Sequence, residues 1–136
     1  MNTPVLVKEV MWKEVDIISN KSTVQNALND MQHKKTKMLI IDKAHEYDEY
    51  GVVLIADIAA KVIAKGRALD RVNVYEIMTK PIVFVHPEME IRYCARLLTR
   101  LGLSRCPVMD RGKIVGVVSL TNIVLNGLHI VSLIQK

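Results

Sequence analysis

The chain carries one sequence pattern twice. Residues 11–31 and 78–98 share an arrangement of apolar and polar residues at a constant offset of 67 positions. Further along, residues 51–58 (GVVLIADI) match residues 116–123 (GVVSLTNI) at an offset of 65. A nearly constant offset through several kinds of secondary structure indicates two copies of one folding unit. Each candidate functional residue therefore has an internal counterpart with which it can be compared.

The first half of each copy is typical of a strand followed by an amphipathic helix. In the first copy, residues 15–18 favour a strand, and Ser22 with Gln25 forms a capping-box pattern ahead of a helix. In the second copy, residues 82–85 favour the strand, and Pro87 suits the first position of the helix. Gly102 is the expected end of that second helix.

The second half of each copy predicts two apolar strands and a short helix. These elements are expected at residues 38–41, 51–55 and 57–65 in the first copy and at residues 106–109, 114–118 and 120–126 in the second. Gly66 and Gly127 are the expected helix ends. Each copy thus reads β-α-β-β-α, which predicts an α+β fold close to the α/β class. We expect the first repeat at residues 5–66, a linker at residues 67–75 and the second repeat at residues 76–133.

Length and composition limit the class of protein. The 136 residues can bury one ordinary core, whereas one copy alone would be marginal, so the copies are expected to share a core. Apolar runs are shorter than the roughly 20 residues of a bilayer span, and Lys8 and Glu9 interrupt the apolar stretch that a signal peptide needs. We therefore expect a cytoplasmic protein that does not enter a membrane. The net charge of +5 suits anionic ligands or nucleic acid, but one Phe, one Trp and four Tyr give little support to nucleic acid.

Metal, redox and catalytic chemistry have little support in the sequence. Cys94 and Cys106 are too few for a disulfide framework and are expected to be buried, reduced core thiols. Residues 45–49 contain one His and three acids without metal-ligand spacing, so we expect a solvated loop and no metal. No pattern pairs a nucleophile with a base, so we expect no enzyme activity.

The junction between the last strand and the last helix of the second copy contains the side chains best suited to bind a ligand. Ser119 places a hydroxyl where the strand ends, beside unpaired helix N-terminal amides, which is a natural seat for a phosphate. Asn122 falls on the same face of the first turn, where its side-chain oxygen can meet a ribose hydroxyl.

With these motifs in their order, the chain resembles a tandem pair of cystathionine-β-synthase (CBS) domains, the Bateman module. The supporting pieces are IMTKP at 77–81, RCPVMD at 105–110 and a Gly-apolar-apolar-Ser/Thr-x-x-Asp junction, and the resemblance covers residues 8–130. It implies repeats packed with pseudo-twofold symmetry through their sheets, and assembly as homodimers through helices. It also implies regulatory binding of AMP, ADP, ATP or S-adenosylmethionine in two clefts between the repeats, with no cofactor required.

The resemblance assigns roles to the junction residues. In the family, the junction Ser or Thr contacts phosphate and the Asp holds the ribose hydroxyls. Ser119 matches the hydroxyl, but Asn122 stands in place of the aspartate. In the first copy Asp57 matches the aspartate, but Leu54 replaces the hydroxyl. We expect the change at Leu54 to weaken a site about tenfold, and that at Asn122 to cost somewhat more.

Other site residues follow by position in the repeats. Those expected around Asp57 are Trp12, Lys13, Lys37, Met38 and Leu39. Those expected around Ser119 are Thr79, Lys80, Pro81, Arg105, Cys106, Pro107, Val108 and Asn122. Lys80 and Arg105 supply charge for a phosphate, and the Trp12 indole suits an adenine ring. Helix capping is an alternative role for Asp57 and Ser119 that needs no ligand.

Together these features predict a stand-alone regulatory CBS pair. It binds an adenosine-containing ligand and signals by a change in the arrangement of its repeats or of a homodimer. The apolar residues 128–136 are expected to dock on the body of the protein or on a second subunit. The other expected partner is an effector protein that the sequence does not identify. The alternatives are a structural dimerisation module with decayed ligand sites and a nucleic-acid-binding module.

Overall fold

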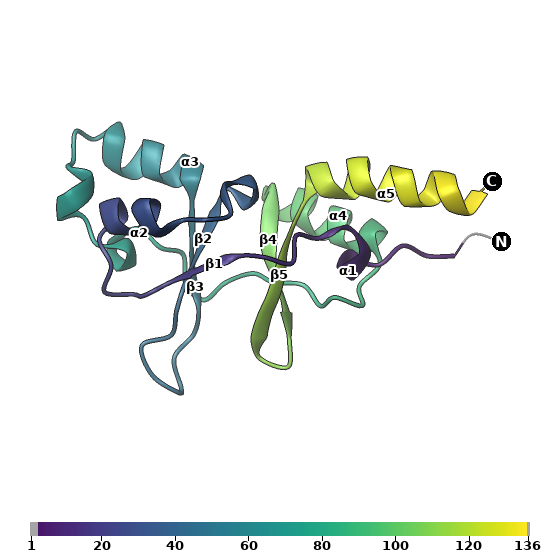
Figure 1. The fold of residues 1–136 in the computed structure, drawn as a ribbon, viewed down its shortest axis with the longest axis horizontal. Helices are drawn as coiled ribbons and strands as arrows, with labels where there is room; N and C mark the ends of the chain where they lie inside the picture. The colour runs from purple at the N-terminus through teal and green to yellow at the C-terminus, as the bar shows by residue number, and fades with distance from the viewer. Residues whose placement is uncertain (1–2, 136) are drawn as a thin grey trace. The chain divides into compact units, whose positions relative to one another are not determined.

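The computed structural model describes residues 3–135, with side chains described for residues 3–128. The elements fall into two compact units. Unit 1 consists of Met1–Glu14 and Val83–Lys136, and unit 2 consists of Val15–Ile82. Helices combine with small sheets in both units, which confirms the predicted α+β class (Figure 1). The units divide the chain differently from the sequence repeats, because the N-terminal segment lies with the second half of the chain.

Unit 2 is built on a three-stranded sheet in the order β1-β2-β3. Its strands are β1 (Asp16–Ile18), β2 (Met38–Ile41) and β3 (Gly51–Leu54). The first two run parallel and the last two antiparallel. The connections include α2 (Val24–Asp30), the 3-10 turn η1 (Lys34–Thr36) and α3 (Ile55–Ile58), which continues as the π-helical turn η2 (Ala59–Ile63). The loop between β2 and β3 projects beyond the sheet (Figure 1).

Helix α2 begins one residue later than the expected capping box. The Thr23 hydroxyl accepts the backbone N–H of Asn26 at 3.1 Å and so caps the helix. The Ser22 hydroxyl instead donates to the Thr23 carbonyl at 3.0 Å. The expected capping box of Ser22 and Gln25 is therefore wrong, because Thr23 satisfies the helix amide in place of Ser22.

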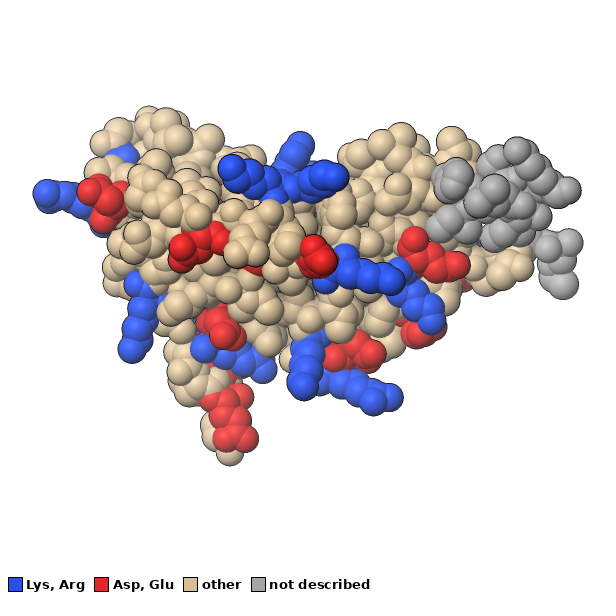
Figure 2. Space-filling model, in the orientation of Figure 1, with Lys and Arg blue, Asp and Glu red and all other residues tan. Residues whose placement is uncertain are grey.

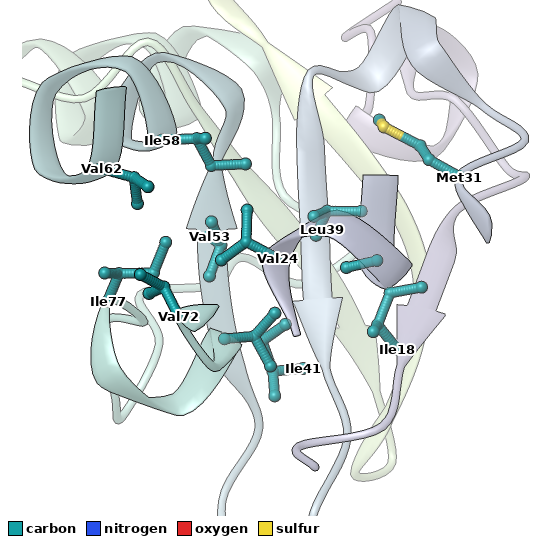
Figure 3. Close-up of a cluster of buried hydrophobic side chains, with 12 residues drawn as sticks. Ile18, Val24, Met31, Leu39, Ile41, Val53, Ile58, Val62, Val72 and Ile77 are labelled. Carbon is teal, nitrogen blue, oxygen red and sulfur yellow. The ribbon is translucent and has the colours of Figure 1, made fainter. Parts of the chain in front are cut away.

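The core of unit 2 lies between the sheet and its helices (Figure 3). Val24 of α2 packs with sheet residues such as Val53 in this buried cluster. Val72 and Val74 belong to the same cluster, although they lie in the segment expected to be a linker. The Val72 carbonyl accepts the Val24 N–H at 2.8 Å, and the Val74 N–H donates to the Ser22 carbonyl at 3.0 Å. This segment, with its 3-10 turns η3 (Leu69–Arg71) and η4 (Val74–Glu76), is thus part of the folded unit.

Unit 1 contains an antiparallel hairpin and three helices. Its elements are α1 (Val7–Val10), α4 (Ile91–Leu101), β4 (Arg105–Asp110), β5 (Lys113–Ser119) and α5 (Leu120–Gln135). The hairpin turn falls at Arg111 and Gly112, whose φ angles are 53° and 77°. Two left-handed residues suit the right-handed twist of a two-residue hairpin. The turn between β4 and β5 is therefore tight.

The strand expected at residues 82–85 does not form. Only Val85 pairs, in parallel with Val108, through Val85 N–H to the Pro107 carbonyl (3.2 Å) and Met109 N–H to the Val85 carbonyl (3.0 Å). Pro107 has no N–H with which to continue this ladder toward Val83. The first repeat has Ile40 at the position of Pro107, and there β1 is a regular strand.

The helices of unit 1 depart from their expected limits at two points. Helix α4 begins at Ile91 rather than near Pro87, but it ends as expected at Gly102, which has a φ of 67°. Helix α5 does not end at Gly127, because that glycine is a packing position. A Cβ there would lie 2.8 Å from the Cδ1 atom of Ile91. The expected docking of residues 128–136 concerns side chains that lie, from residue 129 onward, outside the described ones.

The opening segment of each repeat, around Trp12 in the first and around Thr79 in the second, pairs with a strand from the body of the other repeat. Trp12 exchanges two backbone hydrogen bonds with Val117 of β5, at 2.9 and 3.0 Å. Its counterpart Thr79 exchanges two with Val52 of β3, at 2.9 and 3.0 Å. Each unit therefore combines the body of one repeat with the opening segment of the other.

In each unit, a glycine without a side chain leaves the space that the opening segment occupies. A Cβ at Gly51 would lie 2.6 Å from the Met78 sulfur. A Cβ at Gly116 would lie 2.5 Å from the Trp12 carbonyl oxygen and 2.7 Å from the Met11 sulfur. Close approach of this segment thus explains both glycines, through the Trp12 backbone at Gly116 and through the Met78 side chain at Gly51.

Candidate ligand-binding site

The junction of unit 1 is capped by its own serine. Ser119 ends β5, is fully buried, and its Oγ accepts the backbone N–H of Asn122 at 3.0 Å. The Leu120 N–H donates to the Ser104 carbonyl at 2.9 Å. Ser119 is therefore a helix cap, and within residues 3–128 no group accepts a hydrogen bond from its own O–H.

Asn122 contains a buried donor without a partner. The residue is 5% exposed, and no described group accepts a hydrogen bond from its Nδ2. A buried unpaired donor destabilises a fold by about 1–3 kcal/mol, so most such groups in proteins are paired. Among the described residues of unit 1, Asn122 Nδ2 is the buried side-chain nitrogen that lacks a hydrogen-bond partner.

Strand β4 carries predicted site residues next to Ser119, and their side chains lie on two opposite faces of the strand. Arg105 pairs in register with Ser119, and burial lowers the pKa of its guanidinium. Cys106 and Val108 belong to the hydrophobic core, and Pro107 alternates with them along the strand. The side chains of Arg105 and Pro107 therefore lie on the other face of β4, where Pro107 is buried and Arg105 is half-buried.

The two thiols are buried and reduced, as predicted. A hydrogen bond with Cys94, together with burial, raises the pKa of the Cys106 thiol. Cys106 thus remains protonated at neutral pH and serves packing rather than chemistry.

The junction of unit 2 has the same backbone but a different set of side chains. Leu54 occupies the capping position and makes no side-chain cap, while the Ile55 N–H donates to the Lys37 carbonyl at 3.0 Å. Asp57 is the third residue of α3 and is half-buried. The side chains described for residues 3–128 provide no hydrogen bond or ion pair to its carboxylate. A capping role for Asp57 is therefore wrong, because the cap position belongs to Leu54.

The segment before β2 lies beside this junction. Lys37 is exposed and has a left-handed backbone, with a φ of 54°. Met38 pairs in register with Leu54, and both Met38 and Leu39 are buried. Leu39 belongs to the core cluster, whereas Met38, which alternates with it along β2, does not. Lys37, Met38 and the backbone of β2 are therefore what this segment can offer next to Asp57.

The site residues expected from the opening segment of one repeat lie in the unit that contains the body of the other repeat. Trp12 and Lys13 lie in unit 1, where Trp12 pairs two residues before Ser119 on β5. Residues 79–81 lie in unit 2, where Thr79 pairs two residues before Leu54 on β3. The paired glycines of the GVV motifs are the sequence signal that marks these contacts.

Lys80 already has a partner that the sequence did not suggest. Its Nζ lies 2.6 Å from the Asp48 carboxylate, in the β2–β3 loop of residues 42–50, which is longer than the two-residue turn between β4 and β5. The hydrogen bond from Lys80 and the backbone N–H of Ala44 hold the pKa of Asp48 far below its usual range. The extra length of this loop was the only signal of the ion pair.

Other classes of site find little support in the described residues. Figure 2 shows basic and acidic side chains interspersed over the visible face, with acidic ones on the projecting loop. No three His, Cys, Asp or Glu side chains gather as a metal site in the described part. The helices in that part include none with the length and apolar character needed to span a membrane.

Comparison with known proteins identifies the family. The model of the CBS domain matches residues 74–128. A hexameric CBS-CP12 protein from bloom-forming cyanobacteria is 35% identical, with 94% of this chain and 75% of that chain covered and a TM-score of 0.86. An uncharacterized protein of Methanopyrus kandleri is 26% identical over 125 residues, covering 89% of this chain. The chain spans 63% of that relative's length.

Two similar solved structures contain ligands. CBSX2 in complex with AMP is 26% identical, with 92% of this chain and 97% of that chain covered and a TM-score of 0.71. A CBS domain pair in complex with 5′-methylthioadenosine and S-adenosyl-L-methionine is 23% identical, with 90% and 94% covered and a TM-score of 0.75. At that identity the likeness shows the fold alone. The repeated pattern, the two equivalent junctions and these matches show that the chain belongs to the CBS-domain family as a tandem CBS pair.

Proposed function

We propose that this CBS pair is a regulatory module that binds an adenosine-containing ligand and is not an enzyme. The observation that carries the proposal is the half-buried Asp57 carboxylate, which has no protein partner among the described side chains. An unpaired carboxylate on a first helical turn can accept hydrogen bonds from both hydroxyls of a ribose. The AMP complex of CBSX2 and the 5′-methylthioadenosine and S-adenosyl-L-methionine complex support this ligand class.

Asp57 is the proposed nucleoside-binding residue of unit 2. Lys37 is exposed beside the same junction and can approach an anionic group of the ligand. Lys80 is paired with Asp48, so a ligand phosphate must compete with that carboxylate for it. The ligand can be AMP, ADP, ATP or S-adenosylmethionine, all of which present the same ribose hydroxyls.

Signalling follows from differential binding. A ligand that binds one arrangement of the protein more tightly shifts the population toward it, and a homodimer or an effector protein in the cytoplasm responds. An exposed apolar surface on α5 supports self-association. Val124, Leu125 and Leu128 are 60%, 66% and 65% exposed, and clusters of this kind mark interaction sites.

Calorimetry with AMP, ADP, ATP and S-adenosylmethionine tests the proposal. We expect one of them to bind wild type and Asp57→Ala to weaken that binding by about 10- to 100-fold, since a hydrogen-bonded carboxylate is lost. The matched control is Asp70→Ala, an exposed acid elsewhere in unit 2, which should bind as wild type does. If no ligand at millimolar concentration gives heat or raises the Tm, the regulatory proposal fails and a structural dimerisation role takes its place.

A further inference from the structure

Helix α4 carries three arginines on its solvent-exposed side, which we call the α4 arginine row. Arg92, Arg96 and Arg100 are all exposed and follow one another at intervals of four residues. Successive members therefore lie about 6 Å apart along the helix axis and on one side of it. The core side of α4 contains the buried Cys94 and Leu98, each two positions from an arginine and so on the opposite side of the helix. The row thus takes no part in the core of unit 1.

The fold does not require these charges at these positions. At the offset of 67 positions, Gln25 and Asn29 of α2 correspond to Arg92 and Arg96. Gln25 Nε2 donates to Asn29 Oδ1 at 3.2 Å, so the first repeat has a favourable pair there. The second repeat has two like charges instead, and like charges four residues apart destabilise a helix. The charges of α4 therefore need a reason outside the helix itself.

The protein neutralises the row at one end only. Arg92 lies 3.5 Å from the Glu90 carboxylate. Within residues 3–128, no acidic side chain lies at ion-pair distance from Arg96 or Arg100. Helix α4 also has no acid in its first turn, so Arg92 adds positive charge at the positive end of the helix dipole. A negatively charged partner would relieve both of these unfavourable interactions.

The surface beside the row suits a helical segment of protein. A mostly apolar hollow of about 330 Å³ is lined by Ala95, Arg96, Thr99 and Arg100. The small side chains of Ala95 and Thr99 leave a groove next to the two arginines, and a side chain of a second helix can pack into such a groove. This arrangement combines positive charge with a place for one apolar side chain.

Nucleic acid suits this surface less well. Bases of single strands bind proteins largely by stacking on aromatic rings. Tyr93 is the aromatic residue of α4 and is 45% exposed, but the Arg92 and Arg96 guanidiniums lie 4.8 and 5.5 Å from the centre of its ring. The ring is therefore engaged with the arginines and is not free to stack on a base.

We propose that the α4 arginine row binds an acidic helical segment of a partner protein. Carboxylates at every fourth residue of such a segment have the same spacing as the guanidiniums, which bind carboxylates in bidentate pairs. An apolar residue between these carboxylates would fill the hollow. The inference deepens the proposed function, because it gives the chemical class of the effector, and it rests on that function for the role of the partner. The binding itself requires no adenosine ligand.

Fluorescence anisotropy with a labelled synthetic peptide tests the proposal. The peptide is an alanine-based helix with glutamate at every fourth position and one central leucine, and the control peptide has glutamine in place of glutamate. We expect wild type to bind the glutamate peptide at low salt, to release it as the salt concentration rises, and not to bind the glutamine peptide. The triple variant Arg92→Gln, Arg96→Gln, Arg100→Gln should weaken this binding about 10- to 100-fold, because three ion pairs are lost.

A matched control removes three positive charges elsewhere. The triple variant Lys34→Gln, Lys65→Gln, Arg71→Gln changes exposed residues of unit 2 and has the same net charge as the arginine variant. It should bind the glutamate peptide as wild type does. Equal losses in the two variants would show attraction by net charge alone and would overturn the inference. Because all six residues are exposed, both variants should keep the far-UV circular dichroism and the Tm of wild type.

Other occupants of the row would give different results. If a single-stranded oligonucleotide binds more tightly than the peptide and the arginine variant abolishes that binding, the row belongs to nucleic acid and the inference is overturned. If the arginine variant changes the oligomeric state in analytical ultracentrifugation, the row is an interface between copies of this chain, which also overturns it. Failure of the glutamate peptide to bind at millimolar concentration has the same consequence.

The failure of this inference differs from the failure of the proposed function. If AMP binds and Asp57→Ala weakens it, but the glutamate peptide does not bind, the inference is wrong and the function stands. If the peptide binds through the arginine row while none of the adenosine ligands binds, the function is wrong and the interaction surface stands.

Discussion

The two strand-to-helix junctions share one backbone and differ in their side chains. In unit 2 the Ile55 N–H bonds the Lys37 carbonyl at 3.0 Å, and in unit 1 the Leu120 N–H bonds the Ser104 carbonyl at 2.9 Å. Among residues 3–128, the Asp57 carboxylate has no hydrogen-bond donor and the buried Asn122 Nδ2 has no acceptor. Duplication has thus kept the geometry, whereas the chemistry offered to a ligand has diverged.

The largest loss of stability is expected at Gly116 and Gly51, the glycines of β5 and β3 that lie against the opening segments. A Cβ at Gly116 would meet the Trp12 carbonyl, which is backbone, whereas one at Gly51 would meet the flexible Met78 side chain. Gly116→Ala should lower the free energy of unfolding by about 3 kcal/mol and Gly51→Ala by about 1 kcal/mol. Urea unfolding of both variants checks this. Equal losses would mean that the two approaches are not as different as the contacts indicate.

A second difference lies at Asp16, the first residue of β1, and at its counterpart Val83, where no strand forms. Asp16 is buried and accepts the Gln32 and His33 amides at 2.8 and 2.9 Å, whereas its counterpart Val83 is 40% exposed. Asp16→Ala should cost about 2–3 kcal/mol of unfolding free energy, because a buried charged acceptor of two partly buried amides is lost. Val83→Ala is the control and should stay within about 0.5 kcal/mol of wild type. Denaturant titration would refute the difference if both variants unfolded at one midpoint.

The capping difference between the junctions should be smaller. Ser119→Ala removes the side-chain cap of α5 and should lower the free energy of unfolding by about 1 kcal/mol. Thr23→Ala removes the comparable cap of α2 and provides the reference. Thermal unfolding in the absence of ligand measures both. No loss in Ser119→Ala alone would mean that Ser119 does not act as a cap in solution.

The smallest effect is expected at the ion pair of the β2–β3 loop, whose Lys80 and Asp48 side chains are 30% and 14% exposed. Lys80 lowers the pKa of Asp48, so this pair contributes stability above the unfolded aspartate pKa of about 3.9 and loses it as pH falls through the lower folded value. Asp48→Asn should therefore flatten the decline in stability between about pH 4 and pH 2. Raising the salt concentration should reduce the difference from wild type. Identical acid profiles would contradict a lowered pKa.

Features set by local sequence were predictable. The hairpin turn at Arg111 and Gly112 and the helix end at Gly102 follow from backbone preferences of single residues. The repeat itself led to both junctions and to the contrast between Asp57 and Asn122.

Features set by distant contacts were not predictable in the same way. From the sequence, Gly127 is expected to end a helix, but in the structure it provides space for the Ile91 side chain. The exchange of opening segments and the pairing of Lys80 with Asp48 also join residues far apart in sequence. A local pattern contains no information on such partners, which is why these assignments required the structure.

Adenosine binding to reciprocal variants tests most directly the claim that the two junctions offer different chemistry. Adenosine has the ribose hydroxyls but no phosphate, so calorimetry with it reports only the diol. Wild type should show binding that Asp57→Asn weakens about tenfold, and Asn122→Asp should add a second binding event. An adenosine titration that Asp57→Asn and Asn122→Asp both leave unchanged would contradict the account.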